Sequence, residues 1–245
     1  MNRFARQIWA WGGLSLRAIV RRRSTWVWLV LAIAATASGG VFAPFDFGGR
    51  QGEFLLSISW ALRVAVVVVI AVGLSVQLVL LQEEEGLVPV ALGRGISPIV
   101  LMFGSVAATT MVVSVVAVVT GVVAGLIGVG TGGGLVMSAI MLTLIGILVA
   151  FVVQWMGSMS GAAGFLIGGS LGIIALGFLR PVAVDVGGGA AWFAMLAPDF
   201  AWLGEFNWSA GRAGWGEAGR AIGSSVIYLA VLGWLAARAM GRREY

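Results

Sequence analysis

The residue types that do covalent, redox or metal chemistry are mostly missing from this chain of 245 residues. It has no His and no Cys, and all 15 basic residues are Arg. It therefore offers no imidazole or thiolate metal ligand, no His for a catalytic triad, and no Lys for a Schiff base or a phosphate-binding P-loop. We expect no metal site, no cofactor bound to this chain and no enzymatic activity of its own.

Two short patterns and one group of acids could still indicate chemistry, but each has a simpler interpretation. Residues 128–133 match G-x-G-x-x-G, yet they join two apolar segments without the strands of a dinucleotide-binding fold, so they predict a turn. Residues 158–161 resemble part of an intramembrane protease motif, but Ser158 replaces its leading Gly and the chain has no His to act as base. The loop acids are interpreted as solvated surface charges rather than catalytic pairs. They are Asp46, Glu53, Asp185, Asp199, Glu205 and Glu217.

Apolar segments dominate the rest of the sequence. No charged or His residue occurs between Arg94 and Arg180, and the whole chain is 60% hydrophobic and 10% charged. Because a helix needs about 20 apolar residues to cross a bilayer, we predict an all-α, polytopic membrane protein with about six transmembrane helices. The predicted spans are residues 26–43, 59–81, 99–127, 135–154, 161–179 and 221–237. Together they form one six-span membrane domain over residues 24–245.

Residues 1–23 are predicted to be a cytoplasmic interfacial amphipathic helix. In residues 9–20, Trp, Leu and Ile are interspersed with Arg, which is typical of a helix that lies in the membrane surface. A cleaved signal peptide is the alternative, but 23 residues are long for its charged first region. We therefore expect this segment to remain part of the protein.

The distribution of Arg predicts which side of the membrane each segment faces. With six spans, both termini share one side with ten Arg residues, whereas four lie on the other side. Because cytoplasmic loops carry the excess of basic residues, we place both termini and residues 83–85 in the cytoplasm. The membrane is then expected to be the inner (plasma) membrane of the cell. The Trp-rich residues 180–220 are then external and lie on, or dip into, the membrane surface, or dock an extracytoplasmic protein. The Arg residues flank apolar spans, which argues against nucleic-acid binding.

Two features of the predicted spans could matter for assembly or transport. Five glycines at spacings of four, three, four and four would share one helical face and let another backbone approach closely. They are Gly157, Gly161, Gly164, Gly168 and Gly172. This face is interpreted either as packing within the chain, or as a dimer seam or the wall of a translocation path. Arg63 is expected to extend its guanidinium to the outer headgroups; alternatively, Arg63 and Gln77 line a polar path, since they share one helix face to within about 40°.

The glutamate box, residues 82–98, is the segment most suggestive of a function. Three acids, Glu83, Glu84 and Glu85, precede Gly86 and Leu87. Pro is tolerated in the first turn of a helix and Gly suits its exit, so Pro89 and Gly93 predict a short apolar helix over residues 88–92 at the cytoplasmic surface. The alternative is a solvated loop whose glutamates keep it out of the bilayer.

This box resembles the cytoplasmic loop of permease subunits of type-2 ABC exporters. In that family the second span ends in an acidic stretch, typically followed by Gly-Thr-Leu-Glu and Leu-Leu-x-x-Pro, before a Pro- or Ser-containing entry to the third span. Here Glu83-Glu84-Glu85-Gly86-Leu87 and residues 91–98 stand in those places, and Arg242-Arg243-Glu244 is similar to the basic tail. The chain departs from the pattern by lacking the Thr and by having Val88-Pro89 where Glu and Leu are commoner.

The resemblance implies a permease subunit that exports an amphipathic or hydrophobic substrate. Its partners would be an ABC ATPase subunit, which holds the ATP and Mg²⁺, a second permease subunit in a homo- or heterodimer, and the lipid bilayer. The residues implied to couple the ATPase to the spans are Glu83, Glu84, Glu85, Gly86, Leu87, Val88, Pro89, Leu92 and Arg94. The alternative is a non-transporting membrane scaffold or mechanical relay that couples an ATPase to an extracytoplasmic protein.

Overall fold

The computed structural model describes residues 3–38, 51–129, 132–160, 162–195 and 197–240. These residues form helices and connecting turns, and no strand occurs among them, so the predicted all-α fold is confirmed. The helices are α1 (Arg3–Val20), α2 (Arg23–Ser38), α3 (Gln51–Glu84), α4 (Leu87–Gly93), α5 (Pro98–Leu126), α6 (Gly132–Met159), α7 (Ala163–Phe178), α8 (Arg180–Val186), α9 (Gly188–Met195), α10 (Phe200–Leu203), the 3-10 helix η2 (Phe206–Trp208) and α11 (Trp215–Met240).

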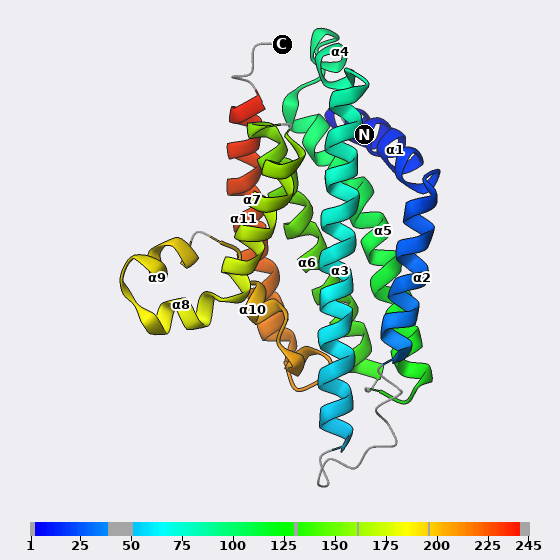
Figure 1. Ribbon diagram of the computed structural model, residues 1–245, viewed down its shortest axis with the longest axis vertical. Helices are drawn as coiled ribbons and strands as arrows, with labels where there is room; N and C mark the ends of the chain where they lie inside the picture. The colour runs from blue at the N-terminus through cyan, green and yellow to red at the C-terminus, as the bar shows by residue number, and fades with distance from the viewer. Residues whose placement is uncertain (1–2, 39–50, 130–131, 161, 196, 241–245) are drawn as a thin grey trace.

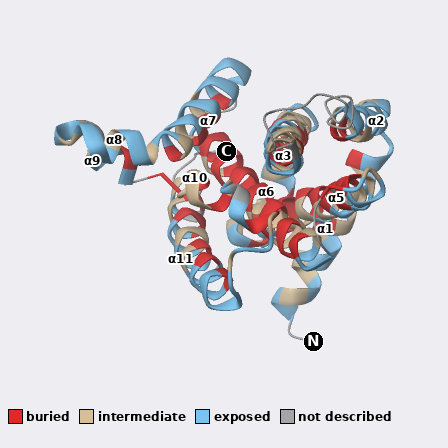
Figure 2. Ribbon diagram, turned by 90° about the horizontal axis from the view of Figure 1, so that it is seen from below, coloured by how far each residue is buried: buried red, intermediate tan, exposed pale blue. Residues whose placement is uncertain are grey.

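Long helices run side by side along the molecule, with α6 at the centre of the bundle (Figures 1 and 2). α6 packs against α3, α5, α7 and α11. Its interior positions, such as Leu142, Ile145 and Leu148, are almost fully buried. A helix that is hydrophobic on all sides is buried in protein or surrounded by lipid, and α5 and α6 both have this composition.

Four helices are long and apolar enough to cross a membrane: α3, α5, α6 and α11. α7 and α8 follow each other with a bend of 67°. If this bent pair is counted as one element, it is a fifth candidate span. These helices indicate a multi-pass membrane protein. The first predicted span corresponds to α2, whose described part has 16 residues; the predicted remainder, residues 39–43, lies outside the described residues.

The fifth predicted span, residues 161–179, contains one helix, α7, and the chain bends where this span ends and α8 begins. α7 has 16 residues, about 24 Å at 1.5 Å per residue, whereas the apolar core of a bilayer is about 30 Å thick. Pro181 explains the break, because it lacks an N–H and its ring collides with the preceding carbonyls of a continuing helix. Pro181 instead occupies the first turn of α8, where it is tolerated.

α1 lies across the end of the bundle from which α4 projects, called the α4 end below (Figure 1). It packs against α5 where Gly12 meets Gly104. A Cβ added at Gly104 would lie 2.7 Å from Trp11 Cδ1 and 3.0 Å from the Gly12 nitrogen. The two helices therefore touch backbone to backbone, which only glycine permits.

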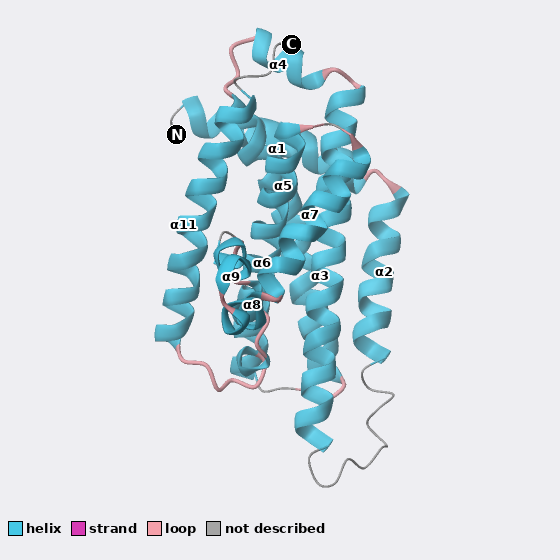
Figure 3. Cartoon of the chain, turned by 60° about the vertical axis from the view of Figure 1, so that its left-hand side comes forward, coloured by secondary structure: helices cyan, strands magenta, loops and turns pink. Residues whose placement is uncertain are grey.

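The predicted external segment, residues 180–220, divides into two parts. α8 and α9 project sideways from the bundle at a level between its two ends (Figures 1 and 3). The part from α10 to η2 instead packs against α7, α6 and α3, with Phe200 and Trp208 buried and Trp60 Nε1 donating to the Gly204 carbonyl at 2.6 Å. Several of the acids interpreted as solvated also make contacts within the chain: Asp199 accepts from the Trp202 N–H, Glu217 accepts from the Gly214 N–H, and Glu53 pairs with Arg212 while its side chain stays 56% exposed.

Candidate functional site

The loop between α3 and α5 is shaped by two glycines with positive φ. Gly86, at φ 61°, turns the chain from the end of α3 into α4. Gly95, at φ 74°, ends the turn after α4, with the Ile96 N–H bonded to the Ala91 carbonyl and the Gly95 N–H to the Leu92 carbonyl. This pair of bonds is the Schellman arrangement that ends many helices, and it favours glycine at the left-handed position. The short helix predicted over residues 88–92 is therefore confirmed, as α4.

α5 starts with its own local signals. Ser97 caps the helix, since its side chain accepts a hydrogen bond from the Val100 N–H at 3.4 Å, and Pro98 occupies the first turn. Both residues are suited to those positions, because the first helical N–H groups need an acceptor and Pro has no N–H to satisfy. The loop thus holds α4 in a defined place between two rigid helices.

α4 projects beyond the bundle (Figures 1 and 3). Some of its apolar side chains are exposed there. Ala91 is its buried contact with the rest of the chain, and Val88 and Leu92 are half-buried. Leu87 is 36% exposed and Val90 is 52% exposed. Val90 is a residue that the sequence analysis did not select, although it lies in the same short apolar run.

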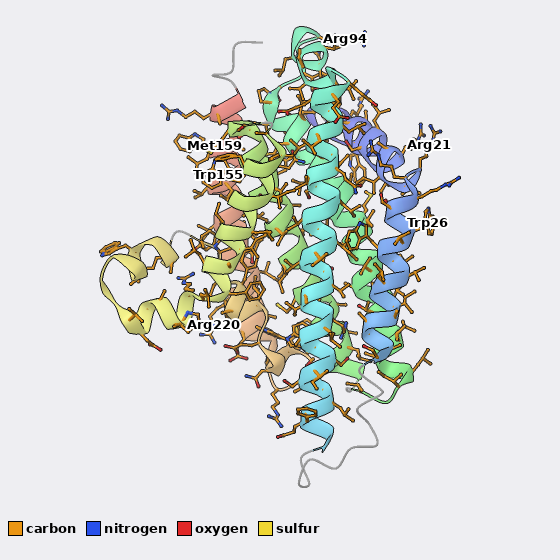
Figure 4. All side chains as sticks on the ribbon, in the orientation of Figure 1. Arg21, Trp26, Arg94, Trp155, Met159 and Arg220 are labelled. Atoms are coloured by element: carbon orange, nitrogen blue, oxygen red, sulfur yellow. The ribbon has the colours of Figure 1, made fainter. Side chains whose placement is uncertain are left out.

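Charged side chains surround this apolar surface. Glu84 and Glu85 are exposed at the end of α3, and Arg94 is exposed after α4 (Figure 4). Glu83 is half-buried. Exposed apolar patches rimmed by polar residues are typical of protein–protein interaction sites. Leu87 and Val90 are thus exposed apolar side chains that lie close in sequence to the exposed acids Glu84 and Glu85.

A buried hydrogen-bonded group connects this loop to α1. Gln82, in the last turn of α3, donates from Nε2 to Ser105 Oγ of α5 at 2.8 Å. Trp11 of α1 donates from Nε1 to the same oxygen at 3.2 Å, and the Ser105 hydroxyl donates to the Leu101 carbonyl at 2.9 Å. Three helices therefore meet at Ser105 beneath α4. Nothing local in the sequence indicates that Gln82 and Trp11 converge on Ser105, because the three residues belong to three different helices.

The five glycines predicted to share one face do not lie on one helix. Gly157 belongs to α6, which ends at Met159, whereas Gly164, Gly168 and Gly172 belong to α7, which begins at Ala163. Gly161 lies outside the described residues. The prediction of a single five-glycine face is wrong because the interruption between the helices breaks the periodicity.

The two groups of glycines also have different surroundings. A Cβ at Gly157 would lie 2.8 Å from Val79 Cγ1, so Gly157 is a contact within the chain. Gly164, Gly168 and Gly172 are exposed, and a Cβ at any of them would have no atom of the described residues within 4 Å. The described residues thus leave this face of α7 uncovered.

Arg63 is buried between helices instead of reaching toward the headgroups. Its side chain is 2% exposed, donates from Nε to Thr120 Oγ1 and from Nη2 to the Ala117 carbonyl, both at 3.4 Å, and lies over the Trp60 ring. The expectation of an outward-extended guanidinium is therefore wrong. The guanidinium fits against α5 because Gly121 has no side chain there. A Cβ at Gly121 would lie 3.3 Å from Arg63 Nη2.

Gln77 lies in another helix contact, where it accepts a hydrogen bond from the Ser24 hydroxyl of α2 at 3.4 Å. Arg63 and Gln77 thus face different neighbours, α5 and α2. The cavity beside Arg63 measures about 10 Å³, room for about one water molecule. Within this one chain, the structure places both side chains in helix–helix packing.

The α8–α9 arm, residues 180–195, is a second exposed apolar surface. Trp192 is 76% exposed, and Val182, Val184 and Val186 are also exposed. The base of the arm is fixed by Arg180, which lies 3.3 Å from the Tyr228 hydroxyl and 3.7 Å from Asp199. The Tyr228 hydroxyl donates to the Met195 carbonyl at 3.0 Å. The arm is therefore anchored at both of its ends.

No model of a known protein family matches the chain, and a search of curated proteins finds no significant match. The resemblance to type-2 ABC exporter permeases therefore depends on residues 82–98, the layout of the spans and the terminal residues 242–244. Among the described residues, no group of three or more His, Cys, Asp or Glu could hold a metal ion.

Proposed function

We propose that this chain is the permease subunit of an ATP-driven ABC exporter, and that a separate ATPase subunit docks on α4. The observation that carries the proposal is the projection of α4 from the end of the bundle, with Leu87 and Val90 exposed beside Glu84 and Glu85. An apolar side chain exposed to water favours burial in a partner. The neighbouring acids would pair with basic residues of that partner and steer its approach.

The contacts below α4 support a role in transmitting movement. α4 is attached directly to α3 and, through a short turn, to α5, and Gln82, Ser105 and Trp11 tie these two helices to α1. A force on α4 would therefore reach three helices at once. In the proposed mechanism, closure of two ATPase subunits on ATP rocks these helices and moves the substrate outward.

The sidedness of the proposal follows from the Arg residues. Arg21 and Arg94 lie toward the α4 end, whereas Arg220 lies toward the other end (Figure 4). The positive-inside rule then makes the α4 end cytoplasmic, with both termini on that side of an inner (plasma) membrane. In this arrangement α1 is the interfacial amphipathic helix and α2 is the first of six spans.

We propose a second permease subunit, identical or similar, beside the open face of α7. Gly164, Gly168 and Gly172 there are exposed within one chain, and small residues allow close contact between helices in a membrane. The translocation path would run between the two subunits. Its walls would be mainly apolar, which suits an amphipathic or hydrophobic substrate.

The exposed α8–α9 arm favours a second candidate function. Exposed aromatic residues such as Trp192 are enriched at protein interfaces. The chain would then be a membrane scaffold or mechanical relay, in which ATPase movement at α4 is passed to an extracytoplasmic protein bound near the arm. Both functions use α4 in the same way and differ in whether a substrate crosses.

Cross-linking from single cysteines tests the docking directly, since the chain has no native Cys. Cys at Val90, on α4, should cross-link to a partner chain that contains a P-loop in native membranes. Cys at Trp202, in α10 away from the α4 end (Figure 1), is the control and should give no such product. Labelling with an impermeant thiol reagent from outside the cell should modify Cys at Trp202 but not at Glu84. Failure of the Val90 cross-link in a complex that contains the ATPase, or outside labelling at Glu84, would overturn the proposal.

A further inference from the structure

An apolar groove of about 230 Å³ lies between the elbow formed by α1 and α2 and the faces of α3 and α5. The elbow contributes Leu16, Val20 and Trp28, α3 contributes Ile70, and α5 contributes Met111 and Val115. The polar side chain in this lining is Thr25, whose hydroxyl donates to the Ile19 carbonyl at 2.7 Å. The lining therefore offers an occupant apolar contact and little hydrogen bonding.

The walls of this groove are held in place by bonds within the chain. Besides the Thr25–Ile19 bond, Trp26 Nε1 donates to the Val20 carbonyl at 3.1 Å, which ties the start of α2 to the end of α1. The Ser24–Gln77 hydrogen bond ties α2 to α3. A groove with fixed walls cannot collapse onto itself, and unfilled apolar walls lose dispersion contacts. An occupant that fits would thus be retained.

In a bilayer the natural occupant of such a groove is a lipid acyl chain. The apolar groove alone gives little preference for one lipid over another. The acyl chains of all lipids are similarly apolar, so no hydrophobic driving force selects among them within a bilayer. Any selection must come from the headgroup at the end of the groove. That end is the α1–α2 elbow, where the lining residues Val20 and Thr25 flank Arg21, Arg22 and Arg23.

The charge at this end of the groove is strongly positive. Arg17, Arg21, Arg22 and Arg23 are exposed (Figure 4 labels Arg21), and none has a carboxylate partner among the described residues. α1 and α2 contain no acidic residue. Each basic residue near a membrane surface favours an anionic lipid by a factor of about five. Two of these guanidinium groups at one phosphate would select an anionic headgroup over a zwitterionic one.

We propose that this groove binds one anionic phospholipid, with an acyl chain along Val20, Ile70 and Val115 and the phosphate at Arg21 and Arg22. The lipid would complete the packing between the α1–α2 elbow and α3 and α5. Because α1 also contacts Ser105 beneath α4, the bound lipid would stabilise the position of α1 at the proposed docking end. The site is independent of the ATPase and of any transported substrate.

The test compares retention of phosphatidylglycerol and phosphatidylcholine with identical oleoyl chains, measured by native mass spectrometry of the full chain in mild detergent. With two guanidinium groups at the phosphate, the wild-type protein should retain phosphatidylglycerol about 25-fold more than phosphatidylcholine. Arg21→Gln with Arg22→Gln should remove this preference. Arg3→Gln is the control, since it also removes an arginine charge from this end of the chain but lies 17 residues before Val20, about 25 Å along the helix. It should leave the preference unchanged.

A second variant tests the groove itself. Val115 is 55% exposed, so Val115→Trp fills the groove without displacing a buried side chain. It should lower retention of phosphatidylglycerol several-fold, while unchanged thermal unfolding shows that the bundle is intact. Equal retention of both lipids by the wild-type protein, or wild-type retention by Val115→Trp, would overturn the proposal. Loss of preference in Arg3→Gln as great as in the Arg21, Arg22 variant would show a diffuse surface charge and would overturn it also.

Discussion

Glycine has different roles in the loop between α3 and α5 and in the region where α6 gives way to α7. In the loop, Gly86 and Gly95 are needed for positive φ angles of 61° and 74°, and a Cβ there would meet nothing within 4 Å. Gly157 of α6 and Gly168 of α7 lie within helices. Their role depends on whether the missing side chain leaves room for a neighbouring group. Gly157 is packed against Val79, whereas Gly168 is open.

This difference shows which use of glycine can be read from a sequence. A turn depends on a few adjacent residues, so the Glu-Gly-Leu and Gly-Arg-Gly surroundings of α4 indicate it directly. A packing face depends on unbroken helical periodicity and on what lies opposite. Neither condition can be read from a few adjacent residues. The break before α7 interrupts the helical periodicity, so the five glycines do not form one face.

The largest effect is expected where glycine permits backbone contact. Gly104→Leu should lower the free energy of unfolding by roughly 2–3 kcal/mol, because its Cβ would meet Trp11 and the Gly12 backbone at 3.0 Å or less. Gly13→Leu, one residue from that contact and with nothing within 4 Å, is the control. Thermal unfolding followed by Trp fluorescence in detergent measures both variants. Equal stability of the two would contradict the α1–α5 packing described above.

A smaller effect is expected where glycine only sets the backbone conformation. Gly86→Ala and Gly95→Ala should each cost about 1 kcal/mol, because left-handed φ is unfavourable for a residue with a Cβ. Gly93→Ala is the matched control, since Gly93 ends α4 without positive φ and a Cβ there contacts nothing. It should be neutral or slightly stabilising. A thermal shift in Gly93→Ala as large as in the other two would mean that the loop does not adopt this shape.

The smallest effect on the chain itself is expected at the open face of α7. Gly164→Leu and Gly168→Leu should change the stability of the monomer by less than about 0.5 kcal/mol. Gly157→Leu, which meets Val79, should be destabilising by comparison. If a second permease subunit covers α7, the first two variants should shift the oligomer toward monomer in size-exclusion chromatography with light scattering. Unchanged assembly in both would remove α7 from the proposed subunit contact.

The sequence predicts the parts of this fold that depend on local composition. The apolar runs identify α3, α5, α6 and α11, and Pro89, Gly93 and Pro98 locate α4 and the start of α5. It also indicates that α4 carries an apolar surface, although Val90 was not among the residues selected. These features are encoded within a few residues of where they appear.

The sequence does not predict features that depend on the opposing helix. Arg63 was expected to reach the headgroups because the sequence shows only that it lies near the end of a span. It does not show that Thr120 and Gly121 of α5 lie opposite the Arg63 side chain. The convergence of Gln82 and Trp11 on Ser105 is likewise created by packing of three distant segments. The bend at Pro181 could have been inferred, since Pro after a glycine-rich helix is a local signal.

The central claim is that the exposed apolar surface of α4 docks an ATPase subunit, and one measurement tests it most directly. Leu87→Asp with Val90→Asp would bury unpaired charge at that contact, whereas Glu84→Gln with Glu85→Gln removes only peripheral charge. We predict that the Asp variant loses retention of the ATPase subunit and at least about ten-fold of its ATP turnover, since burying two unpaired charges costs several kcal/mol. The Gln variant should be weakened mildly and mainly at low salt. Full retention and turnover in an Asp variant whose thermal unfolding matches the wild type would contradict the account.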